Sequence, residues 1–274
     1  MSQETQRHAN TKKRVVYQIP GMDAVTIRQD VEYRLTDTSA LTMDIYYPPD
    51  AKSEARIPAV IFVGGYPDPG NQKILGCKMK EMESYISWGK LSAASGLVAI
   101  TYTTGKDPAA DIHALLQYVR QNAVILGIDE NRIGLWASSG NVPNTLSVLM
   151  QADRDYLKCA VLCYGLMLDL EGSTSVADAA RQWGFVNPCA GKSVDDLPQN
   201  IPLFIVRAGQ DEMPHLNETM DRFLSKTLTC NLPITFVNHL AAPHAFDLMH
   251  DSETSREIIR QILAFMQFHL VGIQ

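Results

Sequence analysis

Ser139, Asp211 and His244 are of the three residue types that cooperate in nucleophilic catalysis, and each follows an apolar run of the chain. A serine hydroxyl is a weak nucleophile near neutral pH, so it needs a general base, which an acid must in turn orient. The order serine, acid, histidine is one of the known orders for such a group. If the fold brings the three together, they predict attack of a serine oxygen on a carbonyl carbon.

The candidate nucleophile lies in the run IGLWASSGN, where an apolar segment breaks into small residues before a predicted helix. A serine raised above a sheet on a sharp strand-to-helix turn needs small neighbours, because the turn is strained. If Ser138 were the nucleophile, Trp136 would stand two positions before it, whereas with Ser139 that position is Ala137. Ser139 is therefore the better candidate. Asn141 stands where the familiar pattern has glycine, and asparagine tolerates unusual backbone angles better than most residues.

The candidate base, His244, lies in the loop APHAFD directly after the last predicted strand. That position is at the carboxyl edge of the sheet, where Ser139 is also expected. His239 and His250 are the alternatives nearby. His239 falls at the end of the strand and His250 begins the final helical region, so we expect His244 to face the serine.

The candidate acid, Asp211, follows an apolar run and a turn in the segment PLFIVRAGQDEMP. Glu212 is its immediate rival, and Asp169, after the preceding strand, is a second one. The carboxyl ends of parallel strands meet at one edge of a sheet. Three separate strand ends would therefore deliver a serine, an acid and a histidine to one place, which is stronger evidence than any single motif.

Attack on a carbonyl also needs hydrogen-bond donors for the developing oxyanion. The backbone amide of Gly140, directly after the nucleophile, is one candidate. The second is expected from the loop after the apolar run PAVIFV, where Gly65 and Tyr66 are both candidates and a plain tight turn is the alternative.

Strand-like and helix-like segments alternate along most of the chain. The pattern predicts strands at residues 31–35, 41–47, 58–63, 97–102, 132–136, 159–164, 202–206 and 233–237. It predicts helices at residues 79–94, 111–126, 144–150, 216–228 and 251–270, the last capped by Asp251 or Ser252. The first two strands are expected to form an antiparallel hairpin closed by Thr36-Asp37-Thr38-Ser39. Apolar strands alternating with helices predict an α/β fold with a mostly parallel sheet covered on both faces.

Residues 171–200 lie between two predicted strands and exceed a normal connection. Next to the catalytic edge, such a segment predicts a small cap or lid, and a surface loop with no part in binding is the alternative. We expect residues 1–14 to form a flexible leader and residues 15–274 to form a single domain.

An apolar substrate pocket is expected beside the serine. Trp183 and Phe185 of the predicted cap, together with Tyr66 and Met213, are the residues expected to shape it. For Trp183 and Phe185, packing within the core or the lid is the alternative.

Composition restricts the partners. The 274 residues carry a net charge of −6, which argues against a nucleic-acid surface. The apolar runs are far shorter than the roughly 20 residues of a membrane span, and the first ten residues are polar, unlike a signal peptide. The 5 cysteines have no CxxC spacing, so we expect buried free thiols and a cytoplasmic protein. The oligomeric state stays open, with a homodimer as one option.

Neither a metal nor a cofactor is expected. His239, His244 and His250 are spaced by five and six residues across a loop, with no closing ligand pattern. Gly64-Gly65 lacks the later glycine or lysine of a phosphate-binding loop.

From about Val31 to Leu270 the chain resembles the α/β-hydrolases, and it is most similar to their esterase and dienelactone-hydrolase-like branch. The resemblance rests on MDIYYPP after the hairpin, a Gly-Gly-Tyr loop, DENRIGLWASSGN, RAGQDEMP and PHAFD. It departs from the pattern at Ala137 and Asn141, and Ser139 stands where the enzymes that name the dienelactone branch use cysteine. The resemblance implies an eight-stranded, mostly parallel sheet with flanking helices and a cap after the sixth strand.

The expected reaction is hydrolysis of a small-molecule carboxylic ester by a serine nucleophile. The same three residues would also serve cleavage of peptide, amide, thioester or C–C bonds. A binding protein that keeps the fold without turnover is the remaining alternative, motivated by the altered residues around Ser139.

Overall fold

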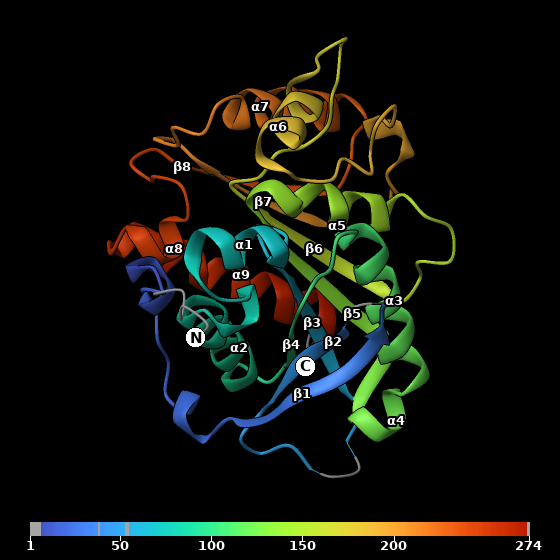
Figure 1. Ribbon diagram of the computed structural model, residues 1–274, viewed down its shortest axis with the longest axis vertical. Helices are drawn as coiled ribbons and strands as arrows, with labels where there is room; N and C mark the ends of the chain where they lie inside the picture. The colour runs from blue at the N-terminus through green and yellow to red at the C-terminus, as the bar shows by residue number, and fades with distance from the viewer. Residues whose placement is uncertain (1–6, 38, 53–54, 273–274) are drawn as a thin grey trace.

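The computed structural model of the chain describes residues 7–37, 39–52 and 55–272. Within them, eight strands form one sheet in the order β1-β2-β4-β3-β5-β6-β7-β8 (Figure 1). The strands are β1 (Thr26–Leu35), β2 (Ala40–Tyr47), β3 (Ile57–Val63), β4 (Val98–Tyr102), β5 (Ile128–Ser138), β6 (Leu157–Cys163), β7 (Leu203–Ala208) and β8 (Ile234–His239). β2 pairs antiparallel with β1 and β4, and all the other pairings are parallel. The predicted eight-stranded, mostly parallel sheet is confirmed.

Two apolar clusters, one on each face of the sheet, hold the layers together. On β3, Ala59 and Ile61 pack into one cluster, whereas Val60 and Phe62 pack into the other, as the alternation of side chains along a strand requires. Because both faces of the sheet are covered, β3 is apolar throughout. Each buried Val, Ile, Leu or Phe side chain contributes roughly 1.5–3 kcal/mol to folding.

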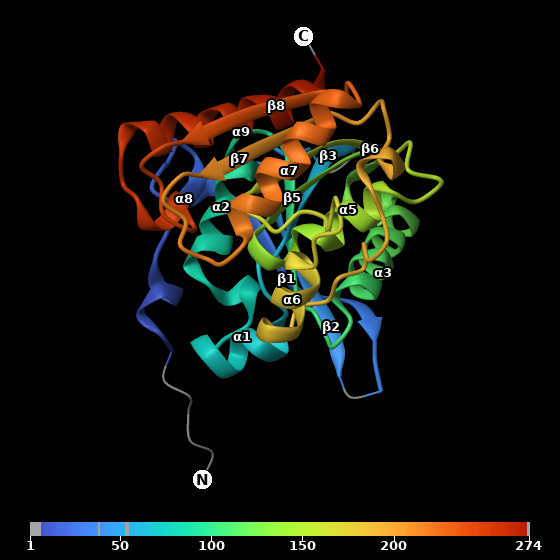
Figure 2. The same cartoon turned by 90° about the horizontal axis from the view of Figure 1, so that it is seen from above.

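Helices cover both faces of this sheet (Figure 2). α2 and α9 pack on one face, and α3, α5 and α7 pack on the other. The α-helices are α1 (Asp68–Leu75), α2 (Glu83–Ala94), α3 (Pro108–Gln121), α4 (Ala123–Leu126), α5 (Val142–Leu149), α6 (Ser175–Trp183), α7 (Leu216–Thr229), α8 (Phe246–Met249) and α9 (Glu253–Val271). The short 3-10 helices are η1 (Ala9–Lys12), η2 (Met22–Ala24), η3 (Met79–Glu81), η4 (Ser139–Asn141) and η5 (Val194–Asp196).

The elements differ from the sequence-based expectations mainly at their ends. The helix expected at 79–94 begins as η3, and α2 starts only at Glu83. The helix expected at 111–126 is two helices, α3 and α4, which meet at Asn122. β1 starts five residues before the expected strand, and β5 continues to Ser138. Ser252 caps α9 by accepting a hydrogen bond from the Ser255 amide at 3.1 Å.

The helix α1 was not expected from its sequence, DPGNQKIL, which has no apolar stripe and contains proline and glycine. Its first residue, Asp68, is buried and fixes the helix through tertiary contacts. The Asp68 carboxylate accepts hydrogen bonds from the backbone amides of Met79 (2.6 Å) and Thr104 (2.7 Å). Burial raises the pKa of Asp68 to about 6. α1 therefore depends on these contacts and not on its own helical propensity.

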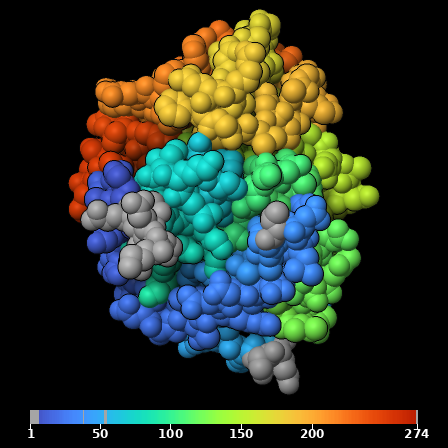
Figure 3. All heavy atoms as spheres, in the orientation of Figure 1, coloured from blue at the N-terminus to red at the C-terminus, as the bar shows by residue number. Residues whose placement is uncertain are grey.

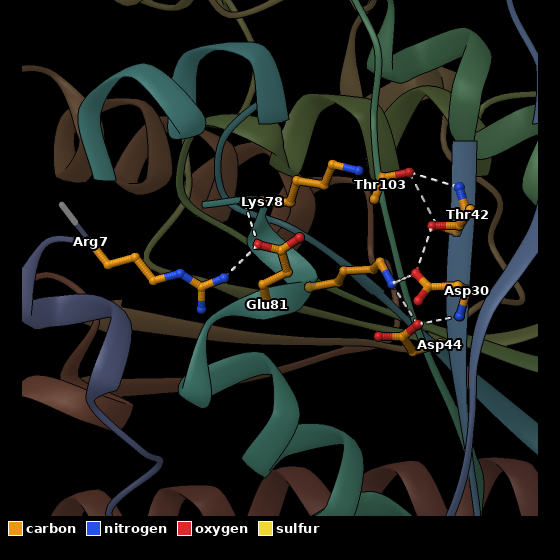
Figure 4. A network of polar contacts seen from close by, with 8 residues as sticks. Arg7, Asp30, Thr42, Asp44, Lys78, Glu81 and Thr103 are labelled. Carbon is orange, nitrogen blue, oxygen red and sulfur yellow. Dashed lines mark hydrogen bonds and ion pairs between the residues drawn. The ribbon is translucent and has the colours of Figure 1, made fainter. Parts of the chain in front are cut away.

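A buried lysine, Lys80, joins η3 to the first two strands, and Figure 4 labels its partners Asp30 and Asp44. Lys80 Nζ lies 2.6 Å from Asp44 of β2 and 2.7 Å from Asp30 of β1. Asp44 also accepts a hydrogen bond from the Asp30 backbone amide at 2.9 Å. Glu81, beside the lysine, pairs with Arg7 at 3.0 Å. The network fixes the connection between α1 and α2 over the edge of the sheet.

The described part of the N-terminal segment, residues 7–14, lies against the body of the protein. The His8 amide donates to the Leu75 carbonyl of α1 at 3.0 Å, and Thr11 is buried. The rest of the expected leader, residues 1–6, lies outside the described residues, as does Thr38 of the expected hairpin turn. All five cysteines are free thiols, four of them buried.

Residues 171–200, which contain α6 and η5, lie between β6 and β7. On the face shown in Figure 3, the yellow part of this segment lies beside the teal helix α1.

Candidate active site

Ser139 stands on a strained turn at the carboxyl end of β5. Its φ is 54°, in the left-handed region, whereas Ser138 before it is extended and ends the strand. A non-glycine residue held there costs about 1–3 kcal/mol, which the surrounding structure must offset. The close packing explains the need for small residues: a Cβ added to Gly65 would lie 3.0 Å from Ser138 Oγ and 3.1 Å from Ser139 Cβ. The turn exposes the Ser139 hydroxyl at the top of the sheet.

His244 and Asp211 form a hydrogen-bonded chain with this hydroxyl. Ser139 Oγ lies 3.0 Å from His244 Nε2, and His244 Nδ1 lies 2.6 Å from Asp211 Oδ2. The Asp211 side chain is fully buried, and its other oxygen accepts the Met213 amide at 3.0 Å. With Nδ1–H donated to Asp211, Nε2 is left to accept the serine proton. The three residues singled out from separate strand ends are brought together.

The alternatives to these residues lie elsewhere or have other partners. Asp169 accepts hydrogen bonds from the amides of the first turn of α6, at 2.7 and 3.0 Å. Glu212 is exposed. His239 and His250 both contact the Ser255 hydroxyl, at 3.0 and 3.2 Å. None of these four residues contacts Ser139 within the described part of the chain.

The candidate oxyanion donors lie beside Ser139, and the two choices in the loop after β3 differ. The Gly65 amide donates to the Tyr85 hydroxyl at 2.8 Å. The Tyr66 amide has no hydrogen-bond partner among the described residues. Gly140 is in η4, at the start of the helical turns that lead into α5, where backbone N–H groups lack intrahelical partners.

Asn141, one of the two residues that depart from the expected motif, joins the turn to the loop after β3. Its Nδ2 donates to the Gly64 carbonyl at 2.7 Å, and the side chain is buried. The sequence showed an unusual residue at this position, but the contact depends on Gly64, 77 residues away. Only the fold brings the two together.

Behind the imidazole lies a second buried carboxylate that sequence reasoning missed. The Tyr164 ring packs edge-on against His244, with centroids 5.0 Å apart. The Tyr164 hydroxyl donates to Asp247 at 2.8 Å, and the Trp88 indole N–H donates to the other oxygen at 2.7 Å. Burial raises the pKa of Asp247. The PHAFD segment thus supplies both His244 and, through Asp247, the anchor for the ring beside it.

A cavity of about 430 Å³ opens next to Ser139 and His244. Its lining is mainly apolar, and among the described residues it contains no Asp, Glu, Lys or Arg. Residues of α1, η3 and the α8 region form one side, including Ile74, Met79 and Met249. The four residues expected to shape a pocket all line it: Tyr66, Trp183, Phe185 and Met213.

The 171–200 segment lines part of this cavity with aromatic residues. The Tyr66 hydroxyl donates to the Trp183 carbonyl, and the Tyr66 and Phe185 rings meet edge to face with centroids 4.9 Å apart. Phe185 also packs over Gly140, since a Cβ added there would lie 2.0 Å from the ring. The segment therefore contacts both the turn that carries Ser139 and the loop after β3.

Among the described residues, no group of three or more His, Cys, Asp or Glu side chains has the arrangement of a metal site. The described helices include none with the length and apolar character needed to cross a membrane.

Comparison with known proteins gives a structural match but no sequence match. No family model and no curated protein matches the sequence. Among solved structures, the chain is similar to a thermophilic esterase from the Planctomycetes species Thermogutta terrifontis, with a TM-score of 0.64 at 19% identity over 91% of this chain and 95% of that one. It is also similar to T. terrifontis esterase 2 phosphoramylated by tabun, with a TM-score of 0.63 at 19% identity over 92% of this chain and 97% of that one. For the same esterase phosphorylated by paraoxon, the TM-score is 0.62 at 18% identity over 92% of this chain and 96% of that one. Together with the sheet order, these matches show that the chain has the α/β-hydrolase fold.

Proposed function

We propose that this protein is a serine hydrolase that cleaves carboxylic esters through an acyl-enzyme. The observation that carries the proposal is the hydrogen-bonded chain from Ser139 Oγ through His244 to the buried Asp211 carboxylate, at the edge of an apolar cavity. The esterase activity named for the structural neighbour, and its phosphorylation by paraoxon, are the chemistry expected of such an arrangement.

In the first half-reaction, His244 Nε2 takes the Ser139 proton as Oγ attacks the ester carbonyl carbon. The carbonyl π electrons move to oxygen, and the resulting oxyanion accepts hydrogen bonds from backbone amides that include Gly140. The tetrahedral intermediate collapses when its C–O bond to the alcohol breaks and His244 gives its proton to the leaving oxygen. Asp211 holds the imidazole in the required tautomer and stabilises its charged form.

In the second half-reaction, water replaces the alcohol. His244 deprotonates the water as its oxygen attacks the acyl carbon, and the same donors stabilise the second oxyanion. Collapse breaks the bond between the acyl carbon and Ser139 Oγ, which recovers the proton from His244. The products are one alcohol and one carboxylic acid, and the enzyme is regenerated without a cofactor.

The substrate class follows from the lining of the cavity. An ionised group buried there would lose its hydration without gaining a charged partner. We therefore propose uncharged esters with an apolar acyl or alcohol group, contacted by Tyr66, Trp183, Phe185 and Met213. Methionines such as Met79 adapt to groups of different shape, which suits a site without strict shape selection.

We further propose that residues 171–200 act as the cap of a single domain spanning residues 15–274. The Gly-Gly-Tyr loop and the acid in RAGQDEMP support placing the chain in the esterase and dienelactone-hydrolase-like branch, with serine in place of cysteine. The homodimer and the cytoplasmic location stay predictions from the sequence, as does the flexible leader at residues 1–14, of which residues 7–14 lie against the body of the protein.

Turnover of paired substrates tests the proposal. We expect p-nitrophenyl butyrate to be hydrolysed and aminoacyl p-nitroanilides to be cleaved at least about 100-fold more slowly, with Ser139→Ala abolishing both. Asp211→Asn should lower kcat about 10⁴-fold while the protein stays folded. Faster cleavage of the anilides would favour peptide or amide bonds, and no turnover of either by the folded wild type would favour a binding protein.

A further inference from the structure

The peptide group between Gly64 and Gly65, next to Ser139, is held at both ends by side chains. Its carbonyl oxygen accepts a hydrogen bond from Asn141 Nδ2 at 2.7 Å, and its N–H donates to the Tyr85 hydroxyl oxygen at 2.8 Å. In a trans peptide these two groups lie in one rigid plane and point in opposite directions. The peptide therefore cannot turn without breaking at least one of these two hydrogen bonds.

This arrangement removes the Gly65 amide from the set of free donors around Ser139. The Tyr85 hydroxyl, whose oxygen accepts the Gly65 N–H, is then a possible donor in place of the Gly65 amide. Among the described residues, the other polar neighbour of that hydroxyl is Ser138 Oγ, at the long distance of 3.5 Å. A phenol has one proton to donate, and in the described part of the chain no strong acceptor takes it. Tyr85 lines the same cavity as Ser139 and His244.

We propose that Tyr85 is a catalytic residue whose hydroxyl donates a hydrogen bond to the oxyanion, alongside the backbone amides of Tyr66 and Gly140. The inference rests on the proposed ester hydrolysis and deepens it. Tyr85 transfers no proton, since the phenol stays neutral through both half-reactions. In the sequence, Tyr85 lies within the helix predicted at residues 79–94, and no backbone motif marks it as a donor.

Two properties suit the phenol to this role. Burial raises the pKa of Tyr85 to about 12, so the hydroxyl keeps its proton at neutral pH. The hydrogen bond that its oxygen accepts from Gly65 polarises the O–H group and strengthens it as a donor. Asn141 is then a positioning residue, since it holds the Gly64–Gly65 peptide in the orientation that engages Tyr85.

The first test compares Tyr85→Phe with a matched control, Tyr33→Phe. Tyr33 is also buried and its hydroxyl also makes one short bond, to the Thr103 carbonyl at 2.6 Å, but it lies on β1 outside the site. We expect Tyr85→Phe to lower kcat for p-nitrophenyl butyrate about 10- to 100-fold with little change in KM, less than the full loss of a donor because the Gly65 amide is freed. Its affinity for a trifluoromethyl ketone, which forms an oxyanion on Ser139, should fall by a similar factor. Tyr33→Phe should change neither quantity.

A second measurement keeps the ring, the packing and the hydroxyl. Replacing Tyr85 with 3,5-difluorotyrosine lowers the pKa of the phenol by several units, and a phenolate cannot donate. We expect kcat of this variant to fall at alkaline pH where the wild type stays active. If Tyr85 only supported the loop, this variant would not show the additional fall of kcat at alkaline pH.

The inference is overturned if folded Tyr85→Phe keeps both kcat and ketone affinity, or if the fluorinated variant keeps the wild-type pH profile. Either result with an active wild type leaves ester hydrolysis intact. If the wild type itself hydrolyses no ester, the proposed function fails instead.

Discussion

The Phe185 ring packs directly over the α-carbon of Gly140, where an added Cβ would lie 2.0 Å from two ring atoms. This contact joins the 171–200 segment to the residue that follows Ser139. Phe185 also meets Tyr66 edge to face, so one ring touches both sides of the site. Glycine is needed at position 140 because the Phe185 ring leaves no space for a Cβ. The backbone itself does not require glycine, since the φ of Gly140 is not in the left-handed region.

We expect Gly140→Ala to displace Phe185 and lower kcat/KM for p-nitrophenyl butyrate at least about 10-fold, because small displacements at a reacting centre cost about that much or more. The backbone amide is kept in this variant, so the loss would come from the clash. Adding Phe185→Ala should restore part of the activity. Steady-state kinetics of the three variants check this, and a double variant no better than Gly140→Ala alone would contradict it.

The ion pair between Lys80 and Asp44 predicts a large effect on stability. Both side chains are buried, so removing the lysine leaves an uncompensated carboxylate in the interior. We expect Lys80→Met to lower the free energy of unfolding by about 3–5 kcal/mol. Lys80→Met combined with Asp44→Asn should recover part of this loss, because the amide is uncharged and can still accept from the Asp30 amide.

The matched control for this prediction is the neighbouring exposed pair of Arg7 and Glu81. Arg7→Ala should cost less than about 1 kcal/mol. Urea unfolding of the variants gives all these values. Equal losses for Lys80→Met and Arg7→Ala would show that the buried network does not stabilise the fold.

Asp68 predicts a pH dependence of stability. Burial raises its pKa from 3.8 to about 6 in the folded protein, so between these values the folded chain holds a proton that the unfolded chain releases. Its stabilising contribution is therefore complete below pH 3.8 and is lost as pH rises through about 6. In that window the free energy of unfolding should fall by about 1.4 kcal/mol per pH unit from this group.

Asp68→Asn removes this contribution, so its unfolding free energy should decline less steeply than that of the wild type between pH 4.5 and 6. The variant should also be less stable throughout, because an amide cannot accept from both Met79 and Thr104. Asp23→Asn, at an exposed position, should keep the wild-type slope. Parallel slopes for Asp68→Asn and the wild type would contradict the assignment.

The cavity lining predicts discrimination against charged substrates. Hydrolysis of p-nitrophenyl hemisuccinate should have a kcat/KM at least about 100-fold below that of p-nitrophenyl butyrate, because its carboxylate would be desolvated without a partner. Ile74 lines the cavity and is exposed enough to accept a longer side chain. Ile74→Lys should reduce the difference in kcat/KM between the two esters. Similar kcat/KM values for both esters in the wild type would show that the acyl group does not enter this cavity.

The sequence was sufficient for the parts of the site that depend on local pattern. Ser139, Asp211 and His244 each follow the end of a predicted strand, and parallel strands present their carboxyl ends together. The alternation of strands and helices likewise predicts the sheet. These signals are carried by residues close together in the chain.

The rest depends on contacts between distant segments. In the sequence, Asn141 is only a departure from a motif and Tyr85 only one residue of a predicted helix. The fold places Gly64 beside Asn141, and the Gly65 amide donates to Tyr85. α1 has no apolar stripe, so its formation depends on the amides of Met79 and Thr104 binding Asp68. Such polar contacts leave no periodic trace in the sequence.

The most direct test of the account is covalent labelling with paraoxon. We expect the wild type to gain the mass of one diethylphosphoryl group, with the modified peptide carrying it on Ser139, as inactivation of ester hydrolysis proceeds in parallel. Ser139→Ala should take no label, whereas Ser138→Ala should still be labelled on Ser139. A folded wild type that takes no label, or carries it on any residue other than Ser139, would contradict the proposed nucleophile.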